Sequence, residues 1–253
     1  MATDALYFNN ETSGGNYFDL TGPALPNGDW AIGFWCRPDL MTNASASYQY
    51  VISAGSLGTA GSMQIFIPSR QSGAEGCLYL RFYSDAGSSE LNTVGCTATV
   101  LPGVGDGSDY LFIVQRRGSD LDYYVVKEGS ATATPTTVAS AAWGGGLNSR
   151  AWRIGGRTDA ASLRWLSNPM GELFVIGQSL TAAQIVNLAS GKHIDAVVAT
   201  RLLDLRFRGN NATEPDLSGN GRNATRTGSN FSLVNEFFPD TAAASVTTPT
   251  ISA

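Results

Sequence analysis

Residues 216–227, DLSGNGRNATRT, carry oxygen-bearing side chains at a spacing that could hold a calcium ion. Asp216, Ser218 and Asn220 occupy alternate positions, as in the opening of an EF-hand loop. Such a loop needs a bidentate Glu at its twelfth position and a helix on either side. Because the twelfth residue is Thr227 and strand-like sequence surrounds the segment, an EF-hand is excluded.

Two interpretations of this segment remain. In the favoured one, Gly219, Asn220 and Gly221 supply the positive φ angles of a hairpin turn. In the other, the segment holds a structural calcium ion in a different kind of loop site, with a second carboxylate brought close by the fold. The candidate ligands of that calcium site are Asp216, Asp19 and Glu172. No other metal or cofactor is expected.

Aromatic residues in loop-like contexts are candidates for a sugar-binding platform. Sugar sites combine an aromatic ring with Asp or Asn acceptors at a concave surface. Trp143 lies in AAWGGG and Trp165 in LRWLSN, whereas Tyr123 and Tyr124 point to opposite faces of one strand, so that one of them can be exposed. The candidate glycan-binding residues are therefore Trp143, Trp165 and Tyr123. The alternative for each is packing in a loop or in the core, which is the commoner use of such residues.

No combination of residues has the spacing of a catalytic site. His193 is the single histidine, and it follows a predicted helix, where a cation suits the helix C-terminus. AGSLG at 54–58 would need a following helix to act as a nucleophile elbow, but strand and loop surround it. Glycoside hydrolysis needs two facing carboxylates, and the predicted strands offer few. We therefore expect no enzyme, and a polysaccharide-cleaving activity is the least favoured function.

The composition limits the kinds of partner. Charged residues make up 15% of the chain, against about 25% in an average domain, and the net charge is −5. Nucleic-acid binding needs clustered Lys and Arg, and no basic run occurs, so we expect no nucleic-acid partner. No apolar run approaches a membrane span, and the opening MATDALYFNN has no ordinary secretion signal, so we expect no membrane partner. Cys36, Cys77 and Cys96 fit neither a disulfide framework nor a zinc site, and we expect small buried residues.

Period-two alternation of apolar residues predicts a protein built mainly from β-strands. Residues 29–37, DWAIGFWCR, are apolar on both faces, so this strand is covered on both sides or lines a groove, and Trp30 and Trp152 are assigned to the core. Further strands are predicted at 48–54, 62–67, 77–83, 109–115, 121–127, 151–156, 171–177 and 200–207. Short strands with Gly-, Ser- and Asn-rich turns predict an all-β fold, an antiparallel two-sheet jelly-roll sandwich.

One short helix near 181–190 interrupts the strand pattern. Thr181 is a good N-cap, Gln184 completes a capping box, and Gly191 can end the helix in the left-handed region. The apolar residues expected to dock on the sandwich are Ile185 and Leu188. The helix is therefore interpreted as architectural.

Five stretches of the chain match known motifs in a consistent order. They are ALYFNNETSGGNYFDL (5–20), DWAIGFWCRPD (29–39), WRIGGR (152–157), GELFVIGQSLTAAQIVNLASG (171–191) and LLDLRFRGNNATEPDLSGNGRNAT (202–225). Together they resemble the laminin-G-like branch of the concanavalin A-like lectin/glucanase superfamily. Glu172 stands where that family often has Asp. The resemblance implies one convex and one concave sheet and a binding module, often with calcium and sometimes with sugars on the concave face or at a loop edge.

The chain is expected to have two parts, a jelly-roll domain at 1–231 and an extended C-terminal arm at 232–253. The arm has no charge after Asp240 and no core pattern, so it needs a partner to become ordered. The apolar residues expected to make its assembly contacts are Phe237, Phe238, Val246 and Ile251. These contacts would serve self-association or binding to other virion proteins.

The fold family is mostly extracellular, but the sequence shows no ordinary secretion signal. A bacteriophage virion protein reconciles the two, because it is made in the host cytoplasm, assembles on the particle and leaves by lysis. We therefore predict a non-enzymatic structural protein of the virion, which decorates the capsid or forms part of a tail or fibre; binding to host or environmental glycans stays open. The alternative is an extracellular, stand-alone carbohydrate-binding module of a secreted or surface protein.

Overall fold

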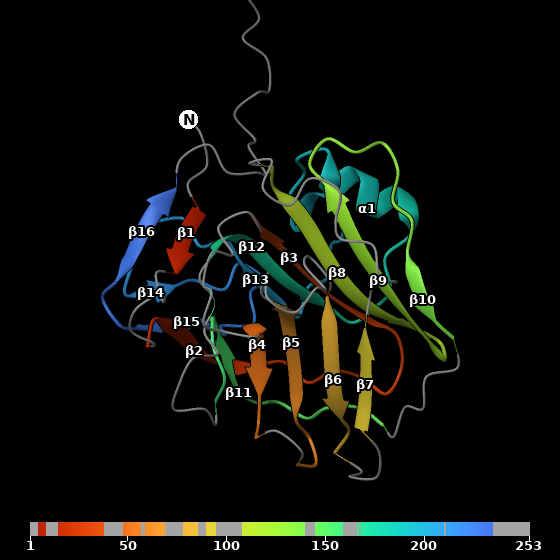
Figure 1. The fold of residues 1–253 in the computed structure, drawn as a ribbon, viewed down its shortest axis with the longest axis horizontal. Helices are drawn as coiled ribbons and strands as arrows, with labels where there is room; N and C mark the ends of the chain where they lie inside the picture. Colours follow the sequence, from red (N-terminus) through yellow and green to blue (C-terminus); the bar gives the residue numbers. More distant parts are fainter. Residues whose placement is uncertain are drawn as a thin grey trace, which may run out of the picture.

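The structure is a computed structural model, and it describes residues 5–8, 15–37, 48–56, 59–68, 78–85, 90–94, 108–139, 145–158, 166, 168–209 and 211–234. Within these residues the strands form two antiparallel sheets of eight strands each, which pack against each other (Figure 1). In the same part of the chain, no helix has the length and apolar character needed to cross a membrane. The all-β sandwich predicted from the alternation of apolar residues is therefore confirmed.

The first sheet has the strand order β10-β9-β8-β3-β12-β1-β16, and β13 pairs with β12 beside this path. Its strands are β1 (Ala5–Phe8), β3 (Trp30–Cys36), β8 (Tyr110–Arg117), β9 (Asp120–Lys127), β10 (Thr136–Val138), β12 (Pro169–Ile176), β13 (Leu203–Leu205) and β16 (Phe231–Val234). β3 lies between β8 and β12 near the middle of the sheet.

The second sheet has the order β14-β15-β2-β11-β4-β5-β6-β7. Its strands are β2 (Tyr17–Gly22), β4 (Tyr48–Ala54), β5 (Met63–Pro68), β6 (Tyr79–Tyr83), β7 (Glu90–Val94), β11 (Arg150–Ile154), β14 (Thr213–Glu214) and β15 (Ala224–Thr227). Strands far apart in the sequence are neighbours here, such as β2 with β11 and β15. This topology brings the loops that follow β2 and precede β11 together at one end of the sandwich.

The main core lies between the two sheets. Trp30 and Phe34 from β3 and Trp152 from β11 are completely buried in it, as the sequence predicted for the two tryptophans. The alternate residues of β3, including Trp35, belong to a second apolar cluster on the outer face of the first sheet. β3 is therefore covered on both sides. Cys36 is a buried free cysteine, as expected, whereas Cys77 and Cys96 lie outside the described residues.

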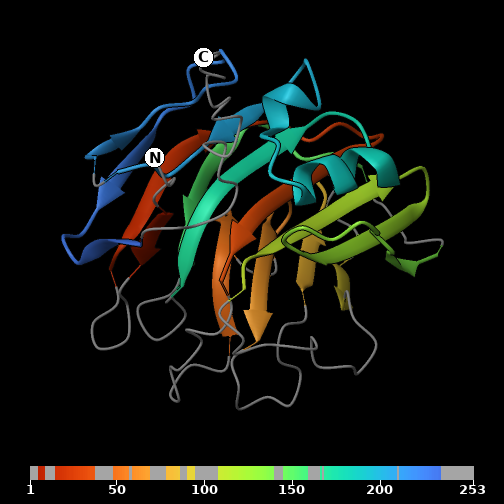
Figure 2. The same cartoon turned by 90° about the horizontal axis from the view of Figure 1, so that it is seen from above.

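The helix α1 (Ala182–Ala189) covers the outer face of the first sheet, beside β8 and β9 (Figure 2). The Thr181 side chain caps its N-terminus and Gln184 completes the predicted capping box. Ile185 is fully buried in the second apolar cluster, and Gly191 ends the helix with a φ of 100°. The architectural role predicted for this helix is confirmed, and a short 3-10 turn η3 (Ile194–Ala196) follows it.

Two of the predicted boundaries can be compared with strands near the C-terminal end of the described residues. The strand predicted at 200–207 is only Leu203–Leu205, and Phe207, two residues after its end, adopts a positive φ of 44°. The domain boundary predicted between residues 231 and 232 falls inside β16, whose residues pair with β1 up to Val234. The sheet therefore includes the first residues assigned to the arm. The predicted arm contacts Phe237, Phe238, Val246 and Ile251 lie outside the described residues.

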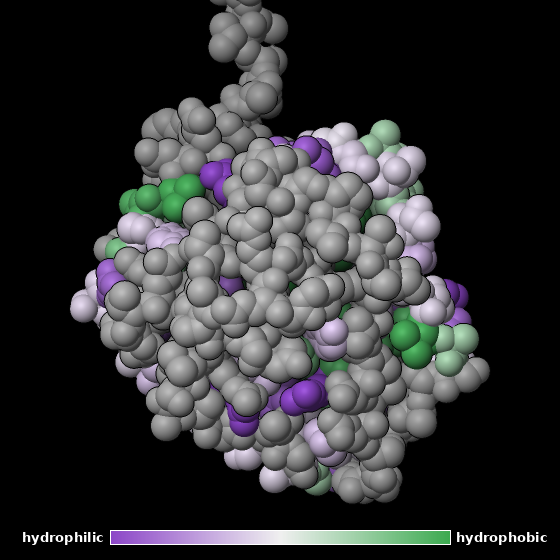
Figure 3. Space-filling view, viewed as in Figure 1, coloured by the Kyte–Doolittle hydropathy of each residue, from purple (hydrophilic) through white to green (hydrophobic). Residues whose placement is uncertain are grey.

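The described part of the surface shows no single large apolar area on the side seen in Figure 3, where apolar and polar residues are interspersed. Among the described residues, the large apolar side chains that are exposed are Leu217 and Leu233. Isolated exposed apolar residues of this kind are normal on soluble proteins.

Candidate functional site

The calcium-like segment forms the turn between β14 and β15, and its carboxylate is used by the backbone. Oδ1 of Asp216 accepts hydrogen bonds from the backbone N–H groups of Asp204 and Ser218, at 3.1 and 3.0 Å. Oδ2 accepts one from the backbone N–H of Arg222 at 3.0 Å. Because both oxygens already accept from N–H donors, Asp216 closes the turn in the way that an Asx turn does.

The hairpin-turn interpretation is confirmed for two of its three residues. Gly219 and Gly221 have φ angles of 86° and 68°, which glycine adopts without strain. The prediction for Asn220 is wrong, since Phe207 is the only non-glycine residue with a positive φ among those that the structure describes. The Asn220 amide instead donates to the carbonyl of Arg201 at 2.9 Å, which ties the turn to the chain before β13.

The three carboxylates predicted to hold calcium are not brought together. Asp19 forms two hydrogen bonds with the guanidinium of Arg153, at 2.9 and 3.1 Å. Glu172 is buried on β12 and accepts from the backbone N–H of Ile194 at 3.1 Å. Within the described ranges, no group of three or more His, Cys, Asp or Glu residues is placed to hold a metal ion. The residues present therefore do not fit a calcium site built from Asp216, Asp19 and Glu172.

Glu172 belongs instead to a buried ionic cluster beside η3. Nδ1 of His193 lies 3.5 Å from Oε1 of Glu172, and Arg206 contacts Asp195 at 2.7 Å and Asp204 at 3.3 Å. Burial raises the pKa of Asp204, and the nearby Glu172 charge adds to that effect. Both carboxylates are almost completely buried, so neither faces solvent, where a substrate would bind. This cluster joins the segment after α1 to the first sheet.

The aromatic candidates do not form a platform in the described residues. Tyr123 is 1% exposed and packs in the main core, so its prediction as a glycan-binding residue is wrong. Its neighbour Tyr124 points to the other face of β9 and is buried in the second cluster. The prediction that Tyr123 and Tyr124 point to opposite faces of the strand is therefore confirmed, but both faces of β9 are covered. Trp143 and Trp165 lie outside the described residues.

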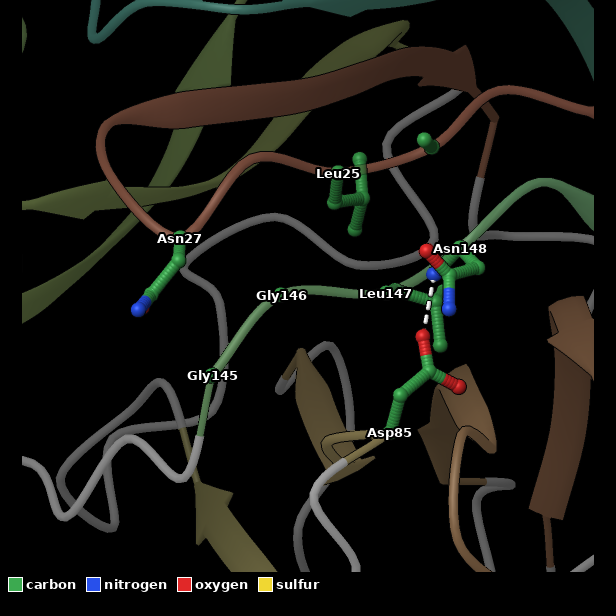
Figure 4. Close-up of a pocket in the computed structure, with 8 residues that line it drawn as sticks. Leu25, Asn27, Asp85, Gly145, Gly146, Leu147 and Asn148 are labelled. Atoms are coloured by element: carbon green, nitrogen blue, oxygen red, sulfur yellow. Dashed lines mark hydrogen bonds between the residues drawn. The ribbon is translucent and has the colours of Figure 1, made fainter.

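A pocket of about 270 Å³ opens at the end of the sandwich where the loops after β2 and before β11 meet (Figure 4). We call it the rim pocket. Its lining residues are Ala24, Leu25, Asn27, Asp85, Gly145, Gly146, Leu147 and Asn148. Ala24, Asn27 and Asn148 are exposed, whereas Leu25 and Leu147 are anchored in the main core. The pocket thus has an apolar floor and a polar opening.

Backbone pairing fixes the shape of the rim pocket. Leu25 and Leu147 exchange two hydrogen bonds, with N–O distances of 2.7 and 3.0 Å. The backbone N–H of Asp85 donates to the carbonyl of Gly146 at 3.2 Å, which joins the end of β6 to the same loop. Backbone hydrogen bonds therefore hold together three segments from distant parts of the sequence, and the side chains at the opening are not needed for this.

The polar groups of the rim pocket are oriented by specific contacts. The Asp85 carboxylate accepts from the backbone N–H of Asn148 and from the Arg150 guanidinium, so its charge is compensated (Figure 4). Oδ1 of Asn27 accepts from Arg116 at 3.0 Å. The pocket therefore presents amide groups, one carboxylate and glycine backbone to a ligand. Asp85, Asn27 and Asn148 were not predicted from the sequence; the available signal was the Gly-rich run that follows Trp143.

The comparisons with known proteins define the fold. No protein-family model matches the chain, and no curated protein matches its sequence. Among solved structures, it is similar to a provisionally named carbohydrate-binding protein from Bacteroides ovatus, with 15% identity and a TM-score of 0.60 over 92% of this chain and 60% of that one. It is also similar to a heptameric SAP-like pentraxin from Limulus polyphemus, with 17% identity and a TM-score of 0.55 over 92% of this chain and 95% of that one.

The likeness to these two structures concerns the fold, the antiparallel two-sheet jelly-roll sandwich, and the concanavalin A-like superfamily stays a prediction. Domains LG4–5 of the mouse laminin α1 chain match with 13% identity and a TM-score of 0.47, over 72% of this chain and 44% of that one. The laminin-G-like branch therefore stays a prediction. Identities this low show the fold alone, and the chain spans only 60% of the length of the Bacteroides protein.

Proposed function

We propose that this chain is a non-enzymatic carbohydrate-binding protein that holds a sugar in the rim pocket. The observation that carries the proposal is the pocket itself, with exposed amides, one fixed carboxylate and two glycines around an apolar floor. The name of the similar Bacteroides ovatus protein adds support for this class of ligand.

The chemistry of the rim pocket suits hydroxyl groups. A sugar hydroxyl both donates and accepts hydrogen bonds, and the amides of Asn27 and Asn148 offer both functions. The Asp85 carboxylate accepts only, and its position is fixed by Asn148 and Arg150. Gly145 and Gly146 have no side chain, so a ligand can approach the backbone closely. With about 270 Å³, the pocket suits one sugar unit, since pockets for larger ligands measure roughly 300–1,000 Å³.

The same lining disfavours catalysis. Glycoside hydrolysis needs two carboxyl groups that flank the scissile bond. Of the eight lining residues in the described part of the chain, Asp85 alone carries a carboxylate, and the Arg150 guanidinium compensates its charge. We therefore expect bound sugar to be released unchanged, and product analysis on a panel of polysaccharides would detect any cleavage.

A glycan array followed by titration calorimetry tests the proposal. We expect Asn148→Ala and Asn27→Ala each to weaken binding about 2- to 10-fold, which is the range for loss of one net hydrogen bond. Asn187→Ala on α1 is the matched control, because it removes the same group from the helix on the outer face of the first sheet, away from the pocket. The proposal would be abandoned if no glycan bound the wild-type protein, or if the pocket variants bound as tightly as the control.

The role as a structural protein of a virus particle, with self-association or binding to other virion proteins through 232–253, stays a prediction. Its likeness to a heptameric pentraxin is compatible with self-association, but sugar binding would serve a virion protein and a secreted module equally well. The proposal on the rim pocket is therefore independent of where the protein acts.

A further inference from the structure

Two Asn–Gly pairs occur in the sequence, Asn27–Gly28 and Asn220–Gly221. The first lies at the rim pocket, which Asn27 lines, and the second lies in the turn between β14 and β15. Asparagine is a thermolabile residue, because the backbone nitrogen of the next residue can attack its side-chain carbonyl carbon. Glycine after asparagine makes this attack easiest, since it has no Cβ to obstruct it. The two pairs share this chemistry, so the fold decides whether they react differently.

The reaction at Asn27 converts its amide to a carboxylate with water as the co-reactant. The backbone nitrogen of Gly28 gives its proton to solvent and forms a bond to Cγ of Asn27, which places a negative charge on Oδ1. The bond from Cγ to Nδ2 then breaks, and the nitrogen takes up protons and leaves as ammonia. A cyclic succinimide remains, and water opens it at either carbonyl to give Asp or isoaspartate. No group is oxidised or reduced in these steps.

The fold holds the carbonyl oxygen of Asn27. Nη1 of Arg116, near the end of β8, donates to Oδ1 of Asn27 at 3.0 Å. Nε of the same guanidinium donates to the carbonyl of Gly118 at 3.0 Å, which fixes its orientation. A fixed cation at this oxygen stabilises the negative charge that develops there during the attack, as an oxyanion-hole donor does. Arg116 therefore favours the reaction at Asn27.

The surroundings of Gly28 leave room for the cyclic product. A Cβ built on Gly28 would meet no atom of the described residues within 4 Å. Asn27 is exposed, so water reaches both its amide and the ring that replaces it. In the described part of the chain, neighbouring side chains therefore block neither the attack nor the opening of the ring.

In the second pair the fold holds the amide nitrogen instead. Nδ2 of Asn220 donates to the carbonyls of Arg201 and Leu202, at 2.9 and 3.3 Å. It also donates to Oγ of Ser218 at 2.9 Å. These three hydrogen bonds engage the nitrogen that has to leave, and they keep Cγ from turning freely toward the nitrogen of Gly221. The turn therefore slows the reaction at Asn220.

We propose that Asn27 is a self-modification site, at which Arg116 promotes attack by the Gly28 nitrogen and the amide becomes a carboxylate. The product lacks the two N–H donors of the amide and adds a negative charge to the pocket that Asp85 also lines, and this charge pairs with Arg116. The modification itself does not depend on the ligand of the rim pocket. If that ligand is a sugar, the modified protein should bind it about 2- to 10-fold more weakly, the range for loss of one net hydrogen bond.

The test follows both pairs in one sample of the full chain. Folded wild type is incubated at mildly alkaline pH, and peptide mapping by mass spectrometry measures Asp and isoaspartate at each site over time. We expect Asn27 to react about 10-fold faster than Asn220, which corresponds to one hydrogen bond to a charged group. In protein unfolded by urea the two sites should react at similar rates, because the contacts that distinguish them are lost. Equal rates in the folded protein would overturn the proposal.

Two variants test the roles of the neighbours. Arg116→Gln should slow the reaction at Asn27 about 10-fold and leave Asn220 unchanged as the internal control. Gly28→Ala should also slow Asn27, and it fits the open space at this position, so it keeps the test available if Arg116→Gln does not fold. An unchanged rate at Asn27 in either folded variant would refute the proposal. Loss of sugar binding on incubation is measured separately, so a failure of the proposed function leaves the result for Asn27 intact.

Discussion

The carboxyl group of Glu214 on β14 makes the stability of the folded chain depend on pH. Glu214 is 4% exposed and accepts hydrogen bonds from the backbone N–H groups of Arg206, at 3.3 Å, Phe207 and Arg208. Burial is the largest effect and raises its pKa from 4.5 to about 7, although the three N–H groups and the Arg208 charge oppose it. One of these donors, the backbone N–H of Phe207, belongs to the residue with a positive φ of 44°.

The direction of this pH effect on stability follows from how many protons Glu214 binds in the folded and in the unfolded state. Between pH 4.5 and about 7 the folded protein keeps a proton on Glu214 that the unfolded chain has released. Stability therefore falls as the pH rises through this window, and it is constant with respect to this group below and above it. The difference between the two pKa values, at 1.36 kcal/mol for each pH unit, gives about 3 kcal/mol.

Urea denaturation of wild type and Glu214→Gln at several pH values between about 4.5 and 8 measures this effect. The amide of the variant does not ionise, and the other titrating groups, Asp204 included, cancel in the difference between the two proteins. We expect the free energy of unfolding of wild type, relative to the variant, to fall by about 3 kcal/mol across the window. Parallel pH profiles for the two proteins, or a rise in this difference with pH, would refute the reasoning.

Packing and loop geometry give three further expectations. Gly33→Ala should lower the free energy of unfolding by about 1–3 kcal/mol, because the new Cβ would collide with the Phe174 ring; an unchanged urea midpoint would show that the ring can move. Asp216→Ala should cost about 1–3 kcal/mol through its unpaired N–H groups, while a chelator leaves the Tm of wild type unchanged. A chelator-induced fall in Tm would restore the calcium hypothesis. If the arm drives assembly, removal of residues 235–253 should convert a multimer into a monomer in light scattering; a multimer that survives truncation would exclude that role.

The parts of the fold that were predicted depend on local patterns. The helix was predicted because Thr181, Gln184 and Gly191 have capping roles that depend on a few neighbouring residues. The strand at 48–54 was predicted with its observed bounds, Tyr48–Ala54, because alternation and flanking turns define it. Two of the strands that were missed, β14 and β10, have only two and three residues, which is too short for a periodic signal.

The site was harder to predict because its residues meet only in three dimensions. Asn27, Asp85 and Asn148 come from three loops, and sheet topology decides that these loops are neighbours. Tyr123 shows a second limit. Alternation separates the two faces of a strand, but it does not tell which face is exposed, and here α1 covers the second one. The calcium candidates are not brought together by the fold, and Arg153 and backbone N–H groups already contact the oxygens of Asp19 and Asp216.

The two outer faces of the sandwich differ in the side chains that they bury. On the first sheet, Trp35 and Phe174 are apolar and pack beneath Ile185 of α1, so this face is completed by the chain itself. On the second sheet, Gln64 and Ser62 bury polar atoms for which the described residues provide no partner. The rim pocket opens at the edge of the second sheet, next to Gly61, and α1 covers the outer face of the other sheet.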